Sequence, residues 1–303
     1  MTQAARRCRR AVSCAALLVL ALSFGAIVAT AAPALADVAT QPTEQQIPGA
    51  GENLETLVRR LIGTAAPQVA PGTQQRVAEA VADIAEGASA GDGRLQRALD
   101  LLQADRVAEA VAPLHAFADD KATHRTGDGK DAATAYRTLG AIAGLVDPGQ
   151  ALNAYVAAIG LDADDIDSLF AAGWIERDRG PPADAERHLG RVVALARGDD
   201  QASYAFWARV GLGELQTRRG DLEAATALYR DAEAIAGRAD PGNAAWLHAL
   251  AVGHYDIAGI QQARGDLAAA LAGYQASQDS FARVAAAEPG DGDAQRDLSV
   301  AQE

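Results

Sequence analysis

The order of apolar and polar positions along most of this chain is helical rather than extended. Amphipathic stretches occur early, at residues 53–62 and 74–86. The sequence lacks the alternating β-branched runs that mark strands, and Ala, Leu, Glu and Arg dominate it. The pattern therefore predicts an all-α protein.

A recurring motif marks the borders between the predicted helices. Arg219-Gly220-Asp221-Leu222 returns as Arg264-Gly265-Asp266-Leu267, and Arg179-Gly180 is a shorter version. Seven residues before each of these glycines stands a small residue: Gly173, Gly213 or Ala258. A residue with almost no side chain lets two helices joined by a turn approach closely. A bulky residue one turn further along fills the remaining gap. The spacing predicts a series of helix hairpins.

These hairpins resemble the tetratricopeptide repeat, a helix–turn–helix unit of about 34 residues. Copies match near 133–165, 166–199, 206–239 and 251–284, with a partial copy at the C-terminus. The residues at the small and packing positions of the motif are Gly140, Ala151, Tyr155, Gly173, Ala185, Gly213, Gly220, Ala225, Tyr229, Gly265, Ala270 and Tyr274. The resemblance implies an α-solenoid that winds as a right-handed superhelix and has a concave groove.

The resemblance divides the chain into regions of different character. The repeat array occupies 131–303, and 52–130 is predicted as a helical N-terminal region with a divergent copy at about 94–119. Residues 37–51 contain Pro and Gln without a helical period, which predicts a flexible linker.

Residues 1–36 have the organisation of an export signal. Arginines near the start precede an apolar stretch from Ala15 to Val28 and small residues up to Ala36. This order predicts cleavage at Ala36/Asp37 and a periplasmic or secreted bacterial protein. The alternative is an uncleaved inner-membrane anchor, since the segment contains enough apolar residues to span a bilayer. Both cysteines, Cys8 and Cys14, lie in this segment, so a mature chain would hold no disulfide.

Charge and motif content argue against several classes of function. A formal net charge of −13 without a basic stripe disfavours nucleic-acid binding. His248 and His254 lie six apart, on different sides of a helix, so they are not expected to share a metal. The acidic run at 162–167 lacks the glycine of a calcium loop. The sequence shows no catalytic constellation, and we expect a non-enzymatic protein without a cofactor or metal.

In tetratricopeptide families the first helix of each unit lines the groove and contacts the bound segment. Transferring those positions gives the groove candidates Arg137, Phe170, Trp174, Arg177, Trp207, Glu214, Arg218, Tyr255 and Gln262. Aromatic and Arg side chains are typical of binding hot spots. The alternative for Phe170, Trp174 and Trp207 is that they pack between helices.

The sequence thus favours an exported, non-catalytic scaffold that mediates protein–protein interaction. Its groove would bind a peptide or protein segment, with Arg side chains meeting carboxylates of the partner. Self-assembly through the solenoid ends is an alternative, because the end of the array is expected to lack a polar cap. A membrane-anchored adaptor is a further alternative.

Overall fold

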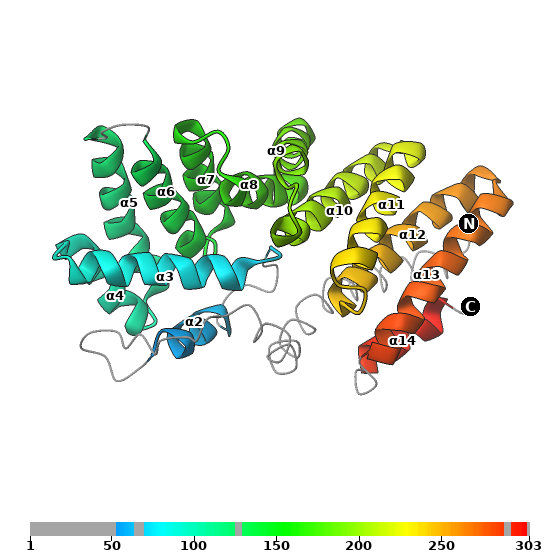
Figure 1. Ribbon diagram of the computed structural model, residues 1–303, viewed down its shortest axis with the longest axis horizontal. Coiled ribbons are helices and arrows are strands. Elements are labelled where there is room, and N and C mark those ends of the chain that lie inside the picture. Colours follow the sequence, from blue (N-terminus) through cyan, green and yellow to red (C-terminus); the bar gives the residue numbers. More distant parts are fainter. Residues whose placement is uncertain (1–52, 64–69, 125–128, 288–291, 302–303) are drawn as a thin grey trace. The chain divides into compact units, whose positions relative to one another are not determined.

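A computed structural model describes residues 53–63, 70–124, 129–287 and 292–301, and every regular element in these ranges is a helix (Figure 1). The helices follow one another as hairpins, which confirms the predicted all-α, hairpin-repeat fold. The chain forms two compact units, 1–175 and 176–303, which divide within one helix. The predicted signal, its cleavage position and the predicted linker lie outside the described residues.

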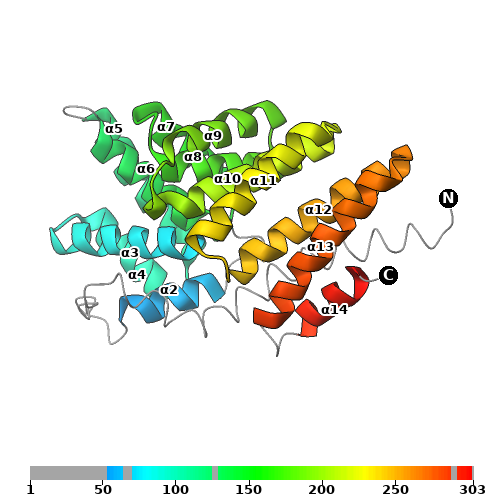
Figure 2. The same cartoon turned by 45° about the vertical axis from the view of Figure 1, so that its right-hand side comes forward.

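In the first unit the helices are α2 (Leu54–Gly63), α3 (Thr73–Ser89), α4 (Gly93–Gln103), α5 (Val107–Thr123), α6 (Lys130–Ala143), α7 (Pro148–Leu161) and the greater part of α8 (Ile166–Arg179). Helices α4 and α5 form one hairpin, and α6 and α7 form the next. Helix α3 lies crosswise to α5 and α6 and packs against the first helix of both hairpins, α4 and α6 (Figures 1 and 2).

In the second unit the helices are α9 (Pro182–Leu195), the short η1 (Asp199–Gln201), α10 (Ala202–Arg219), α11 (Leu222–Ala239), α12 (Ala244–Arg264), α13 (Leu267–Ala287) and α14 (Gly292–Ala301). The pairs α10–α11 and α12–α13 are hairpins, and α14 packs on α13. Helix α12 begins before the expected start of the fourth copy at 251, because Asn243 caps it by accepting a hydrogen bond from the Trp246 N–H.

The repeated Arg-Gly-Asp-Leu motif ends one helix and begins the next. Gly220 and Gly265 both have φ of +85°, a left-handed conformation that favours glycine. The following Asp221 and Asp266 accept hydrogen bonds from the N–H of Ala224 and Ala269, which caps α11 and α13. Four consecutive residues therefore encode a complete hairpin turn.

Tyrosines fill the gaps that the glycines leave within and between hairpins. A Cβ on Gly140 would lie 2.8 Å from the Tyr155 ring, and a Cβ on Gly213 would lie 3.0 Å from the Tyr229 ring. Tyr229 also packs against Gly253 of the next hairpin, where a Cβ would lie 2.4 Å away. Because the ring occupies the space of a missing side chain on both sides, Tyr229 joins two successive hairpins.

The remaining packing positions of the motif are mostly buried. Ala151, Ala185, Ala225 and Ala270 lie in the interior, and Gly173 is also buried. Tyr274 is half-buried, and its hydroxyl donates to Gln262 Oε1 at 3.0 Å.

Candidate functional site

The first helices of the hairpins in unit 1 are covered by the chain's own helix α3. Val77, Ala80, Val81 and Ile84 of α3 are buried in the same apolar core as Leu139 and Ile142 of α6. The Thr138 hydroxyl of α6 donates to Asp83 Oδ2 of α3 at 3.0 Å. Helix α3 therefore occupies the face on which a partner segment was expected.

Arg137 of α6 is engaged within the same unit. Its Nη1 lies 3.0 Å from Asp165 Oδ1 and 3.7 Å from Asp167 Oδ2. Burial alone would lower the pKa of Arg137, but Asp165, Asp167 and Glu79 raise it overall. Asp165 also accepts a hydrogen bond from the Ser168 hydroxyl. Arg137 thus joins α6 to the start of α8.

Phe170 and Trp174 are interior residues. They are 1% and 9% exposed, and their ring centroids lie 5.5 Å apart. The Arg76 guanidinium of α3 lies over the Phe170 ring, 5.7 Å from its centroid. Of the two interpretations given for these groove candidates, the burial supports packing between helices, because the i, i+4 spacing that lines up two rings on a surface also lines them up in a core.

Trp207 is likewise an interior residue, at 5% exposure. Phe206 lies edge-on to it, and the other side of Phe206 stacks on Trp246 of α12 with centroids 4.5 Å apart. This aromatic cluster holds α10 against α12. For Trp207 too, the burial supports the alternative of packing between helices rather than the groove.

A row of charged side chains crosses the first helices of unit 2. Arg177, near the end of α8, lies 2.8 Å from Asp178 Oδ2 and 3.0 Å from Glu214 Oε2 of α10. Arg218 of α10 donates to the Arg177 carbonyl at 2.8 Å. Although burial alone would lower it, the pKa of Arg177 is raised overall by Glu214 and Asp178. The arginines of this face are therefore engaged with groups of their own chain.

Carboxylates dominate the open part of this row. Burial, reinforced by Asp178, raises the pKa of Glu214 even though Arg177 and Arg218 oppose the shift. Burial and Glu214 together raise the pKa of Asp256 on α12 to about 6. Nevertheless 40% of the Glu214 side-chain surface is accessible to solvent, and Asp256 is exposed. Both carboxylates therefore lie at a solvent-accessible surface, where neighbouring protein groups disfavour their ionised forms.

Residues beside the row complete the face. Tyr229 lies behind it, and burial together with Glu214 and Asp256 raises the pKa of its hydroxyl. Tyr255 of α12 is half-buried against the ring of Tyr274, with centroids 5.3 Å apart, and Gln262 is exposed. We call Glu214, Arg218, Tyr255, Asp256 and Gln262 the acidic face.

The structure contains a buried polar pair that was not predicted from the sequence. His188 Nδ1 of α9 lies 2.6 Å from Glu176 Oε2, and both side chains are at most 5% exposed. Arg187 contacts the other ring nitrogen at 2.9 Å. The pair joins α9 to the last turn of α8. A buried Glu and His twelve positions apart give no motif in the sequence.

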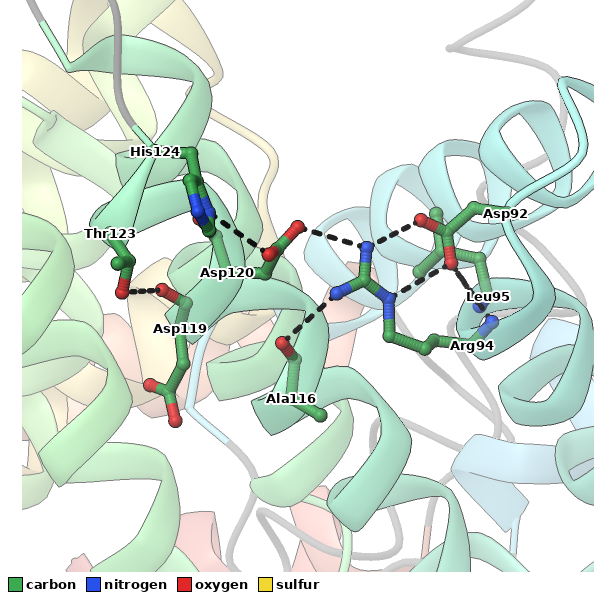
Figure 3. Close-up of polar contacts among 8 residues, drawn as sticks. All are labelled: Asp92, Arg94, Leu95, Ala116, Asp119, Asp120, Thr123 and His124. Atoms are coloured by element: carbon green, nitrogen blue, oxygen red, sulfur yellow. Dashed lines mark hydrogen bonds and ion pairs between the residues drawn. The ribbon is translucent and has the colours of Figure 1, made fainter.

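A second polar network joins the ends of α4 and α5 (Figure 3). Arg94 binds Asp92 Oδ2 at 2.8 Å, Asp120 Oδ2 at 3.1 Å and the Ala116 carbonyl at 3.4 Å. Asp92 in turn caps α4 by accepting from the Arg94 and Leu95 N–H groups. The hydrogen bond from Arg94 lowers the pKa of Asp92. The polar groups of this network are hydrogen-bond partners of one another, which fits a structural role.

The described part of the chain offers neither a cluster of metal ligands nor a helix suited to a membrane. These residues contain no group of three or more His, Cys, Asp or Glu side chains placed to hold a metal ion. No helix among them combines the length and the apolar character needed to cross a bilayer.

Comparison with known proteins gives fold-level likenesses only. No family model matches the chain, and no curated protein matches it. Among solved structures, a crystal structure of MamA aligns with 19% identity and a TM-score of 0.34, covering 52% of this chain and 87% of that one. A tetratricopeptide repeat protein from Parabacteroides merdae ATCC 43184 aligns with 12% identity and a TM-score of 0.37, covering 82% of this chain and 99% of that one. The description of the fold as tetratricopeptide-like rests on the hairpins of this chain.

Proposed function

We propose that this protein is an exported, non-catalytic scaffold that binds a segment of a partner protein on the acidic face of unit 2. The observation that carries the proposal is a pair of solvent-accessible carboxylates on two contacting helices, Glu214 of α10 and Asp256 of α12, both with raised pKa values. The raised pKa values mean that ionisation of these carboxylates is disfavoured, and a cation brought by a partner would favour the ionised forms.

The same geometry indicates the chemistry of the segment. Arg177 is already paired with Glu214 and Asp178, and Arg137 with Asp165. Partner carboxylates would therefore compete with carboxylates of the chain itself, whereas a Lys or Arg side chain would meet the exposed Asp256 and the accessible part of Glu214, which would keep its contact with Arg177. The segment is expected to be basic, rather than acidic as the arginine pattern in the sequence suggested.

Unit 1 offers an internal precedent for the binding mode. There an amphipathic helix, α3, lies across the first helices of two hairpins and is fixed by buried aliphatic residues and one Thr–Asp hydrogen bond. An amphipathic helix with basic flanking residues is the corresponding ligand for unit 2.

A peptide-display selection tests the proposal. Random peptides selected on the immobilised protein should be rich in Lys and Arg, and their affinity should fall at least tenfold in the Glu214→Gln/Asp256→Asn variant. The control is Glu223→Gln/Asp200→Asn, which removes two exposed acids of unit 2 outside the acidic face. The control variant and the test variant therefore have the same net charge. Equal loss in both double variants, or peptides without basic residues, would refute the acidic face as the binding site.

Export is tested separately. The protein recovered from a bacterial periplasm or culture medium should begin at Asp37 on N-terminal sequencing. Recovery only from membranes, with residues 1–36 intact, would instead support the membrane-anchored adaptor.

A further inference from the structure

Two large apolar side chains are open to solvent on the first half of α13. Leu267 is 66% exposed and Leu271 is 59% exposed. They lie one turn apart on the helix and so form one stripe. Ala268, Ala272 and Gln275 beside them are also exposed, whereas Ala270, Ser277 and Phe281 face the core. The stripe is therefore outside the hairpin core.

The same side of α13 receives another helix further along. Ala285 stands eighteen residues after Leu267, or about five helical turns, and so lies on the same side of α13. Ala285 is buried, and its carbonyl accepts a hydrogen bond from Gln295 Nε2 of α14. Helix α14 is also tied to α12, where His248 Nε2 lies 3.2 Å from Asp297. The two views show α14 beside the second half of α13 only (Figures 1 and 2). The side of α13 that accepts a helix at one end thus presents two leucines at the other.

The charges of this surface indicate what covers it. Residues 267–278 contain no charged side chain, although the chain has a net charge of −13. Two copies of an acidic protein repel one another unless they meet through an uncharged surface. In two antiparallel copies related by a two-fold axis near Leu271, Arg264, the exposed last residue of α12 just before the turn into α13, would approach Asp279 of the other copy. Small Ala268 and Ala272 permit close approach of the two helices.

We propose that α13 is a self-association surface, through which two copies of this chain form a two-fold symmetric dimer centred on Leu271. Because the exposed apolar stripe contains only two large side chains in each copy, we expect a weak equilibrium dimer, in the micromolar range. The two-fold arrangement closes at two copies and does not propagate into a filament. The proposal does not depend on the acidic face.

Sedimentation equilibrium of the purified full chain over a concentration series tests the proposal. The protein should change from monomer to dimer as concentration rises, without larger species. Leu267→Asp/Leu271→Asp should be monomeric throughout, with unchanged helical circular dichroism. Val156→Asp, at a 45% exposed valine on α7, is the control and should still dimerise.

Charge exchange tests the register. Arg264→Glu alone should weaken the dimer severalfold, and adding Asp279→Arg should restore it. A strictly monomeric wild type, a dimer that survives both leucine changes, or species that grow beyond two copies would overturn the proposal. If the true occupant were an apolar helix of another protein, the wild type would be monomeric, and the proposal would likewise be overturned.

Discussion

The first helices of the hairpins are covered by another helix in unit 1 but carry solvent-accessible carboxylates in unit 2. In unit 1 these helices are covered by α3, whose Val77, Ala80, Val81 and Ile84 are buried against them. In unit 2 the corresponding helices α10 and α12 carry Glu214 and Asp256, which are accessible to solvent and have raised pKa values. One face is covered by a helix of the chain itself, and the other presents the carboxylates at which we propose that a partner binds.

The difference lies in a few side chains rather than in the hairpins themselves. Tyr155 against Gly140 and Tyr229 against Gly213 are the same packing device in the two units. Burial of aliphatic groups stabilises by about 25 cal/mol per Å², so a covered face adds to the stability of its unit. Confined carboxylates reduce stability while they stay ionised. A repeat scaffold can therefore use one face for stability and the other for binding.

Truncating the covering helix should have the largest effect. Ile84→Ala removes a fully buried side chain of α3 and should lower the free energy of unfolding by about 2–4 kcal/mol. Urea denaturation followed by circular dichroism measures the loss. Val156→Ala on the exposed side of α7 should cost little; a comparably small effect at Ile84 would show that α3 is not integral to unit 1.

Adding one methyl group at the junction between two hairpins of unit 2 should come next. Gly253→Ala places a Cβ 2.4 Å from the Tyr229 ring and should destabilise by about 1–3 kcal/mol despite the better helix propensity of Ala. Gly237→Ala, with nothing within 4 Å of the new Cβ, should stabilise the protein by up to about 1 kcal/mol. If thermal melting showed that both variants are stabilised, or that both are destabilised, relative to the wild type, tight packing at Tyr229 would be disproved.

Removing the hydrogen bond that joins α3 to α6 should have a smaller effect. Thr138→Val keeps the shape of a side chain that is 6% exposed but deletes its donor to Asp83. The expected loss is about 1 kcal/mol in urea denaturation. Asp83→Asn provides the comparison, because an amide oxygen can still accept from Thr138; a larger loss there than in Thr138→Val would contradict this account.

Replacing Asp256 is expected to have the smallest effect on stability, and this effect should depend on pH. The pKa of Asp256 is about 6 in the folded chain against 3.8 ordinarily, so its contribution favours folding below pH 4 and is lost as pH rises through 6. Asp256→Asn should therefore be more stable than the wild type at pH 7.5, by less than about 1 kcal/mol because the side chain is exposed, and equal to it near pH 4. Melting temperatures across this range measure the difference. A stability difference between the variant and the wild type that grows towards pH 4 would contradict this prediction.

Local signals made the hairpins predictable from sequence. The Arg-Gly-Asp-Leu motif specifies a left-handed glycine followed by a capping Asp, and both requirements involve neighbouring residues only. The crosswise path of α3 was not predictable, because it depends on contacts between residues far apart in the chain, such as Asp83 and Thr138.

The candidate site was less predictable for the same reason. Phe170, Trp174 and Trp207 occupy positions that suit either a groove or a core, and burial by neighbouring elements decides between them. The sequence pointed to Glu214 only through the family resemblance and did not single out Asp256. Its raised pKa arises from burial and from Glu214 on another helix, 42 positions earlier in the chain.

Amide hydrogen exchange, measured with and without a selected basic peptide, tests most directly that the two faces differ in their capacity to bind. Exchange should slow in α10 and α12 when the peptide binds and stay unchanged in α3 and α6. Protection confined to α3 and α6, or release of α3 by the peptide, would contradict the account.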